Sequence, residues 1–145
     1  MAIQLNTGKQ EFQLIFDGGI VEKIYFNPND PDLAKRLSEF QERISEKLKS
    51  LEDTKLATDG TPETNEMIEK YKKFRESFDE EFDRAFNSNI SETVFKYCSP
   101  FALIDGEYYV VQFINGIKPE IEKHIKKATA EADKKMQKHI GKYIK

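Results

Sequence analysis

The fold of this chain is decided by residues 61–87, which read TPETNEMIEKYKKFRESFDEEFDRAFN. Aromatic residues recur there at steps of three or four positions: Tyr71, Phe74, Phe78, Phe82 and Phe86. At about 100° per residue, this spacing places all of them on one face of an α-helix. Rings of this size need an apolar cover, whereas the opposite face is charged. We expect a core face, and keep Tyr71, Phe74, Phe78 and Phe82 as candidates for core or partner binding.

A second long helix is predicted upstream of the aromatic one. Asp30 can cap its first turn, and Pro31 suits the first helical position, where its missing N–H is not needed. Apolar residues then step by threes and fours: Leu33, Leu37, Phe40, Ile44, Leu48 and Leu51. Turn signals at residues 58–62 separate the two helices, with Thr61 as cap and Pro62 opening the second. A short connection between long helices predicts an antiparallel pair.

Residues 11–26 predict a β-hairpin. Apolar and polar residues alternate in two arms, and the Asp-Gly-Gly sequence between them suits a tight turn. Both faces carry apolar residues, and one helical layer can cover only one of them. The other face, or a free strand edge, is then available to a second copy of the chain. We expect self-association through Ile15, Ile24 and Phe26.

The chain beyond the aromatic helix is less regular. A short helix is expected over residues 91–98. Residues 101–115 fit either a second hairpin around an Asp-Gly turn or a helix in phase with the apolar positions that follow. We favour the helix, with Gly116 and Pro119 dividing the C-terminal region into two helices. This segment adds three candidates for core or partner binding: Tyr108, Tyr109 and Phe113.

The composition fits one domain with a core of its own. The chain has 145 residues, of which 38% are hydrophobic and 34% charged. We predict a single domain over residues 1–145 that is mainly α with a small N-terminal β-hairpin (α+β). Its parts are the hairpin at 11–26, a helical hairpin with a short helix at 31–98, and C-terminal helices at 101–145.

Composition also restricts the location and the partners. A net charge of −3 argues against a nucleic-acid binder, and the lysine-rich end is typical of a solvated helix face. The single cysteine, Cys98, excludes an internal disulfide and fits a reducing compartment. The first residues lack the features of a signal peptide, and no apolar run is long enough to span a bilayer. We expect a cytoplasmic protein that binds neither nucleic acid nor membrane.

No group of residues points to an enzyme. His124 and His139 are the only histidines and have no local cysteine or acid cluster, whereas a zinc site needs three or four ligands. The acids of the aromatic helix lie on helix turns and not on a loop that converges oxygens on calcium. No Gly-rich phosphate loop or nucleophile elbow is present. We expect a non-catalytic protein without a cofactor or a metal.

The order of these features resembles a known family. Short motifs carry the resemblance: Ala85-Phe86-Asn87, Val94-Phe95, Ser99-Pro100-Phe101, Tyr108-Tyr109-Val110-Val111-Gln112-Phe113-Ile114 and Pro119-Glu120-Ile121-Glu122-Lys123-His124. Preceded by a hairpin and two long helices, they are similar to the tail assembly chaperones of long-tailed phages and Gram-positive prophages. The likeness is strongest over residues 27–57 and 85–140.

This resemblance implies a helical protein that coats the tape-measure protein and self-associates before the tail tube polymerises. The tail-tube protein is a further implied partner, recruited in many phages by a longer, frameshifted form. The family has no strict motif for tape-measure contact, so no binding residue is carried over. Two rivals stay open: a structural virion component, such as a head–tail connector or tail completion protein, and, more distantly, a catalytic phage accessory protein.

Overall fold

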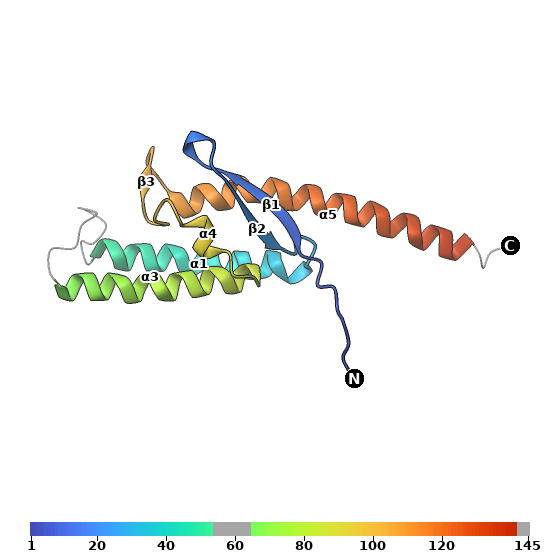
Figure 1. Ribbon diagram of the computed structural model, residues 1–145, viewed down its shortest axis with the longest axis horizontal. Helices are drawn as coiled ribbons and strands as arrows, with labels where there is room; N and C mark the ends of the chain where they lie inside the picture. The colour runs from blue at the N-terminus through green and yellow to red at the C-terminus, as the bar shows by residue number, and fades with distance from the viewer. Residues whose placement is uncertain (54–64, 142–145) are drawn as a thin grey trace.

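The computed structural model describes residues 1–53 and 65–141. Two long helices lie side by side, and the last helix lies alongside them and extends well past them toward the C-terminal end (Figure 1). The predicted mainly α fold with a small N-terminal hairpin is confirmed. In chain order the elements are β1 (Gln10–Ile15), η1 (Asp17–Gly19), β2 (Val21–Phe26), α1 (Pro31–Asp53), α3 (Asn65–Phe86), α4 (Ser91–Val94), β3 (Leu103–Ile104), β4 (Glu107–Tyr108) and α5 (Tyr109–Gly141).

Helices α1 and α3 form the predicted antiparallel pair (Figure 1). The apolar stripe of α1 faces the core, and its buried residues are Leu33, Leu37, Phe40 and Ile44. The ring centroid of Phe40 lies 5.4 Å from that of Phe78 and 5.7 Å from that of Phe82. These are favourable spacings for tilted aromatic pairs, so the two stripes cover each other. The expected turn at residues 58–62 lies outside the described residues.

Strands β1 and β2 form the predicted N-terminal hairpin, with six residues paired in each. Gly18 and Gly19 at its turn have φ angles of 79° and 80°, a region that residues with a Cβ rarely adopt. The N–H of Phe16 donates to the C=O of Ile20 at 2.8 Å and closes the turn. The Asp-Gly-Gly sequence therefore sets the register of the hairpin.

The inner face of the hairpin is part of the core. Phe12, Ile24 and Phe26 are 7%, 2% and 0% exposed. Phe26 stacks on Phe12, with centroids 4.4 Å apart, and meets Phe86 of α3 at 5.1 Å. The expectation that Ile24 and Phe26 lie on an exposed self-association face is wrong, because the two-residue period puts both beside Phe12. Ile15 lies on the outer face and is 75% exposed.

The connection from α3 to α4 is built on Asp83. Its carboxylate accepts hydrogen bonds from the N–H of Ile90 at 2.9 Å, the N–H of Ser91 at 2.7 Å and the hydroxyl of Ser91 at 2.7 Å. Backbone donors at the start of a helix have no partner within the helix, so a carboxylate placed there satisfies them. Asp83 thereby fixes the direction in which the chain leaves α3.

Helix α4 is shorter than the helix expected over residues 91–98, because it ends at Val94. Val94 and Phe95 are 0% and 6% exposed. Phe95 is the residue after the helix, and its backbone angles, φ −102° and ψ 17°, leave the helical range. Phe95 then packs against α3.

Residues 101–115 contain a tight hairpin followed by the start of a helix. Strands β3 and β4 pair around Asp105 and Gly106, whose φ angles of 51° and 81° are the two positive values of a type I′ turn. The expected helix is wrong up to Tyr108 and right from Tyr109, where α5 begins. The Asp-Gly turn forms a hairpin here because the apolar residues at helical spacing, which indicated a helix, begin only after the turn.

Helix α5 is continuous, so the expected division into two helices is wrong. Gly116 and Pro119 both lie inside it. A proline inside a helix lacks one hydrogen bond and costs about 3 kcal/mol. Ile114, Ile117 and Ile121 are 1%, 5% and 8% exposed, and their burial on both sides of Pro119 keeps the helix in one phase.

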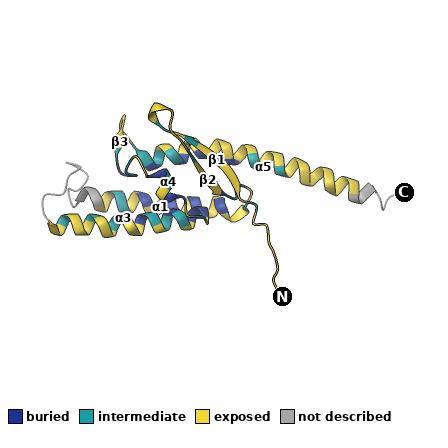
Figure 2. Cartoon of the chain, viewed as in Figure 1, coloured by how far each residue is buried: buried dark blue, intermediate teal, exposed yellow. Residues whose placement is uncertain are grey.

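One hydrophobic core joins the N-terminal hairpin to the helices. Figure 2 shows the buried residues concentrated where α1, α3, α4, the hairpin and the first half of α5 meet, while the second half of α5 is exposed. Within the described ranges, no helix is long and apolar enough to cross a membrane.

Candidate functional site

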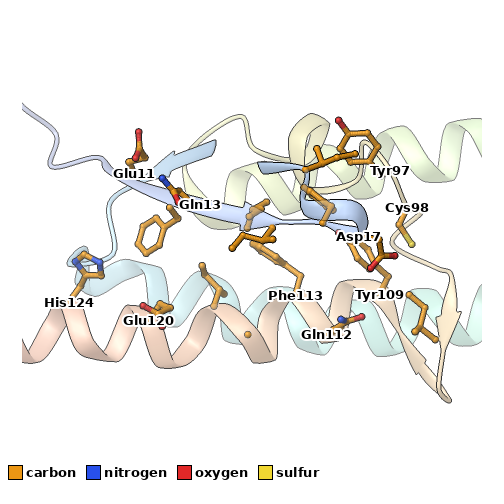
Figure 3. A pocket seen from close by; sticks show the side chains of 18 residues that line it. Glu11, Gln13, Asp17, Tyr97, Cys98, Tyr109, Gln112, Phe113, Glu120 and His124 are labelled. Carbon is orange, nitrogen blue, oxygen red and sulfur yellow. The ribbon is translucent and has the colours of Figure 1, made fainter. Parts of the chain in front are cut away.

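A groove of about 750 Å³ runs between β1 and the first half of α5. Figure 3 shows its labelled side chains spread along β1, from His124 and Glu120 of α5 at one end to Asp17, Tyr97 and Cys98 at the other. We call it the β1 groove. Its walls come from residues 11–17 and 112–124, and its remaining lining residues are Ile20, Tyr97, Cys98, Ile104 and Tyr109.

The β1 groove combines apolar side chains with acids. Ile15, Ile20 and Ile104 are 75%, 44% and 41% exposed, so water reaches large apolar groups there. The acids that line it are Glu11, Asp17 and Glu120, and its described lining includes no lysine or arginine. Glu11 and Glu120 are ion-paired with Lys23 at 3.4 Å and Lys123 at 3.3 Å, so the groove suits an apolar chain segment chiefly through its apolar side chains.

Strand β1 presents a free edge to this groove. Its sheet contains only β1 and β2, and in the described part of the chain no strand pairs with the other side of β1. The bond from Phe16 N–H to Ile20 C=O fixes which backbone groups face β2, and strand alternation then turns those of Glu11, Gln13 and Ile15 outward. A row of unpaired backbone groups is a template for an added strand.

Two titratable side chains of the groove favour their neutral forms. Burial raises the pKa of the Cys98 thiol and of the Tyr109 hydroxyl. The hydroxyl of Tyr109 donates to the C=O of Val94 at 2.9 Å, and a thiol with a raised pKa is a poor nucleophile. Among the residues that the structure describes, no group of three or more His, Cys, Asp or Glu is placed to hold a metal ion. The arrangement supports binding of a chain segment.

A second surface is the α5 extension, which we define as residues 126–138. It projects from the body (Figure 1), and all of its side chains are exposed except that of Ala128, which is half-buried. Its apolar stripe continues that of the first half of α5 at the same spacing, through Ile125, Ala128, Ala132 and Met136. Ile125 is 42% exposed and Met136 62%. This stripe has no cover within the described structure.

A smaller groove lies at the base of the α5 extension. It has a volume of about 430 Å³, lies between α1 and α5, and is lined by Leu33, Leu37, Ile121 and Ile125 among others. We call it the α1–α5 groove. Because Ile125 belongs both to this groove and to the stripe, the groove lies at the inner end of the stripe.

The structure places the candidates from the aromatic helix in and around the core. Phe78 and Phe82 are 0% exposed, so they are core residues and have no surface for a partner. Tyr71 and Phe74 are half-buried, and their rings lie 6.3 and 5.2 Å from that of Phe101. These two pack at the border of the core.

The later candidates lie near or in the β1 groove. Tyr109 and Phe113 line it together with Ile15, whereas Tyr108 ends β4 and is half-buried outside the lining. Sequence reasoning missed the contributions of Ile20 and Ile104. Each lies beside a turn with an apolar neighbour, Val21 or Leu103, and such short apolar pairs have no longer periodicity to mark them.

No protein-family model, no curated protein and no solved structure matches this chain. Its function is therefore inferred from its own residues and surfaces.

Proposed function

We propose that this chain is a non-catalytic tail assembly chaperone of a phage or prophage, which coats the tape-measure protein and self-associates before the tail tube polymerises. The observation that carries the proposal is the α5 extension, a helix that leaves the body with an apolar stripe along it. The resemblance of the sequence motifs supplies the identity of the partner.

The stripe has the spacing of a helix-recognition face. Ile125, Ala128, Ala132 and Met136 follow one another at steps of three or four, the pattern by which amphipathic helices pack. The two alanines at its centre allow the axis of a partner helix to approach closely. A solvent-exposed helix of this length gains stability when a partner covers its apolar side.

The α1–α5 groove extends this face onto the body of the protein. A partner helix lying along the extension reaches the mouth of this groove at its inner end, where Ile125 is 42% exposed. The helix surface around the stripe is basic, since residues 118–138 contain seven lysines and four acids. An amphipathic tape-measure helix with acids beside its apolar stripe would match both the apolar and the charged parts.

The proposal assigns the chain to the cytoplasm of a bacterial host. Its partners there are the tape-measure protein and further copies of itself. The tail-tube protein, polymerising around the tape measure, would displace the coat. Reversible displacement is compatible with a contact made by a single exposed stripe with a charged border.

Co-expression with the tape-measure protein of the same genome, followed by affinity capture, tests the proposal. Ala132→Asp combined with Met136→Asp charges the stripe and should abolish capture. The matched control, Ala130→Asp combined with Gln137→Asp, adds the same two charges on the opposite face of the same helix and should retain it. Failure of the unaltered chain to capture the tape-measure protein would overturn the proposal.

The rival reading as a virion component has a separate outcome. A chaperone leaves the particle during assembly, so mass spectrometry of purified virions should not detect this chain. A stoichiometric amount in finished particles would favour a connector or completion protein.

A further inference from the structure

The N-terminal arm, which we define as residues 1–7, is extended and projects from the body (Figure 1). Ile3 and Leu5 are 81% and 82% exposed. They alternate with Ala2, Gln4 and Asn6, so an extended backbone turns both apolar side chains to one side. The arm thus has the pattern of a half-buried strand but no sheet to pair with.

The root of the arm is fixed by specific contacts. Gly8 has a φ of +75°, and its N–H donates to the side-chain oxygen of Asn6 at 2.9 Å. The side-chain amide of Asn27 donates to the C=O of Thr7 at 3.0 Å. A Cβ at Gly8 would lie 3.1 Å from that amide nitrogen, so both the space and the backbone angle favour glycine. These contacts direct the arm to the side away from α5, and so away from its own β1 groove.

The β1 groove fits such an arm in length, chemistry and charge. Six extended residues span about 20 Å, and β1 presents a free edge of six residues. The exposed Ile15 and Ile104 offer apolar contacts for Ile3 and Leu5. The arm contains no acid, so it places no charge against the acids of the groove.

We propose that the arm of one copy adds as a strand to the free edge of β1 in a second copy, with Ile3 and Leu5 seated in the β1 groove. The inference deepens the self-association of the proposed function, while its evidence lies only in the arm and the groove. Arm and groove are different surfaces of one copy. Each contact therefore leaves one arm and one groove unfilled, and the contact can repeat from copy to copy.

Sedimentation velocity of the full chain alone, over a wide concentration range and with any tag at the C-terminal end, tests this proposal. Ile3→Asp combined with Leu5→Asp should raise the Kd of self-association roughly a hundredfold or more, because two apolar side chains lose their burial. The melting temperature should not change, since both side chains are exposed in the single copy. Ala2→Asp combined with Gln4→Asp charges the other side of the arm and should associate as the unaltered chain does.

A mixing experiment identifies the two surfaces. Ile104→Asp should block the groove and leave the arm intact, and Ile15→Asp is a second groove variant should the first lower the melting temperature. The arm variant and the groove variant should each be monomeric, whereas their mixture should form 1:1 pairs and nothing larger. A mixture that remains monomeric, or an arm variant that associates normally, would overturn the inference.

The outcomes separate this inference from the proposed function. The arm variant should still capture the tape-measure protein, because its α5 extension is unchanged. A chain that is monomeric alone and whose arm variant loses capture would place the arm on the partner, which would also overturn the inference. If Ala132→Asp combined with Met136→Asp abolishes capture but leaves self-association unchanged, the result concerns the α5 extension and not the arm.

Discussion

The two halves of α5 have the same periodicity but opposite surroundings. In the first half, the apolar residues at steps of three or four, from Val110 to Ile121, are at most 8% exposed. In the α5 extension the same steps lead to Met136, which is 62% exposed. The first half packs against the hairpin and α3, whereas the described structure places nothing on the extension (Figure 2).

The two halves of α5 show that having an apolar face and having that face covered are separate properties of a helix. Periodicity defines which face of a helix is apolar, and the rest of the fold decides whether that face is covered. The packed half also nucleates the helix, so the extension needs only propagation, which is far less costly than nucleation. A partner that bound this face would meet a preformed helix, which lowers the ordering cost of binding.

The largest difference between the packed body and the α5 extension is expected from deletion of one side chain in each. The ring of Phe82 lies 4.7 Å from that of Phe95 and 5.7 Å from that of Phe113 in α5. Phe82→Ala should lower the free energy of unfolding by about 3–5 kcal/mol, through lost burial and a cavity. Met136→Ala in the extension should change it by no more than about 0.5 kcal/mol. Urea unfolding followed by circular dichroism measures both, and equal losses would show that the extension belongs to the packed body.

A smaller difference in the free energy of unfolding is expected when an aspartate is replaced by alanine in the body and in the extension. Asp83 accepts three hydrogen bonds at the start of α4, the helix that leads into the loop beneath α5. Asp83→Ala should lower the free energy of unfolding by about 1–3 kcal/mol, because partly buried donors lose their acceptor. Asp133→Ala in the α5 extension is the matched control and should have almost no effect. An equally small effect at Asp83 would mean that water replaces the carboxylate.

Alanine substitutions at two glycines test how backbone conformation, apart from packing, contributes to the free energy of unfolding. Gly116 lies in the helix with open space where a Cβ would stand, so Gly116→Ala should raise the free energy of unfolding by about 0.4–1 kcal/mol. Gly106 also has open space but a φ of +81°, so Gly106→Ala should lower it by about 1–2 kcal/mol. Thermal unfolding of both variants checks the opposite signs. Two changes of the same sign would contradict this account.

The smallest change in stability is expected for Glu22, at the exposed edge of the packed body. Hydrogen bonds from Lys96 at 3.0 Å and from Tyr97 at 2.8 Å hold the pKa of Glu22 below its usual value of 4.5. Because the pKa is lowered on folding, this contribution is present above pH 4.5 and disappears as the pH falls through the folded value. Glu22→Gln should therefore be slightly less stable than the unaltered chain at neutral pH and equally stable in acid. A stability difference that persists in acid would assign the effect to shape and not to charge.

Much of the secondary structure could be predicted because local residues determine it. The stripes of α1 and α3 and the Asp-Gly-Gly turn each act over a few positions. The continuity of α5 could not be predicted, because Pro119 is a local signal for a break and only the burial of Ile117 and Ile121 against other elements overrides it. The role of Asp83 could not be predicted either, because its partners, Ile90 and Ser91, lie seven and eight residues further along the chain.

The candidate surfaces were harder to predict than the fold. Alternation assigned apolar residues to both faces of the hairpin, but which face is covered depends on elements far along the chain. Ile24 was therefore expected outside and is inside, while Ile15 lies on the rim of a groove. The β1 groove exists only because α5 packs beside β1. These elements are far apart in the sequence, so no local pattern predicts that they are neighbours.

The dependence of the hairpin on α5 also has a consequence for biosynthesis. The ring of Phe12 rests on His124, with centroids 5.2 Å apart, and Phe26 rests on Phe86 of α3. At roughly 5–20 residues per second, the ribosome makes the hairpin roughly 5–20 s before the segment of α5 that covers it. During that interval Phe12, Ile24 and Phe26 lack their cover, and both strand edges are open. Nascent chains aggregate through such surfaces, so the hairpin is exposed to misassociation until the synthesis of α5 is complete.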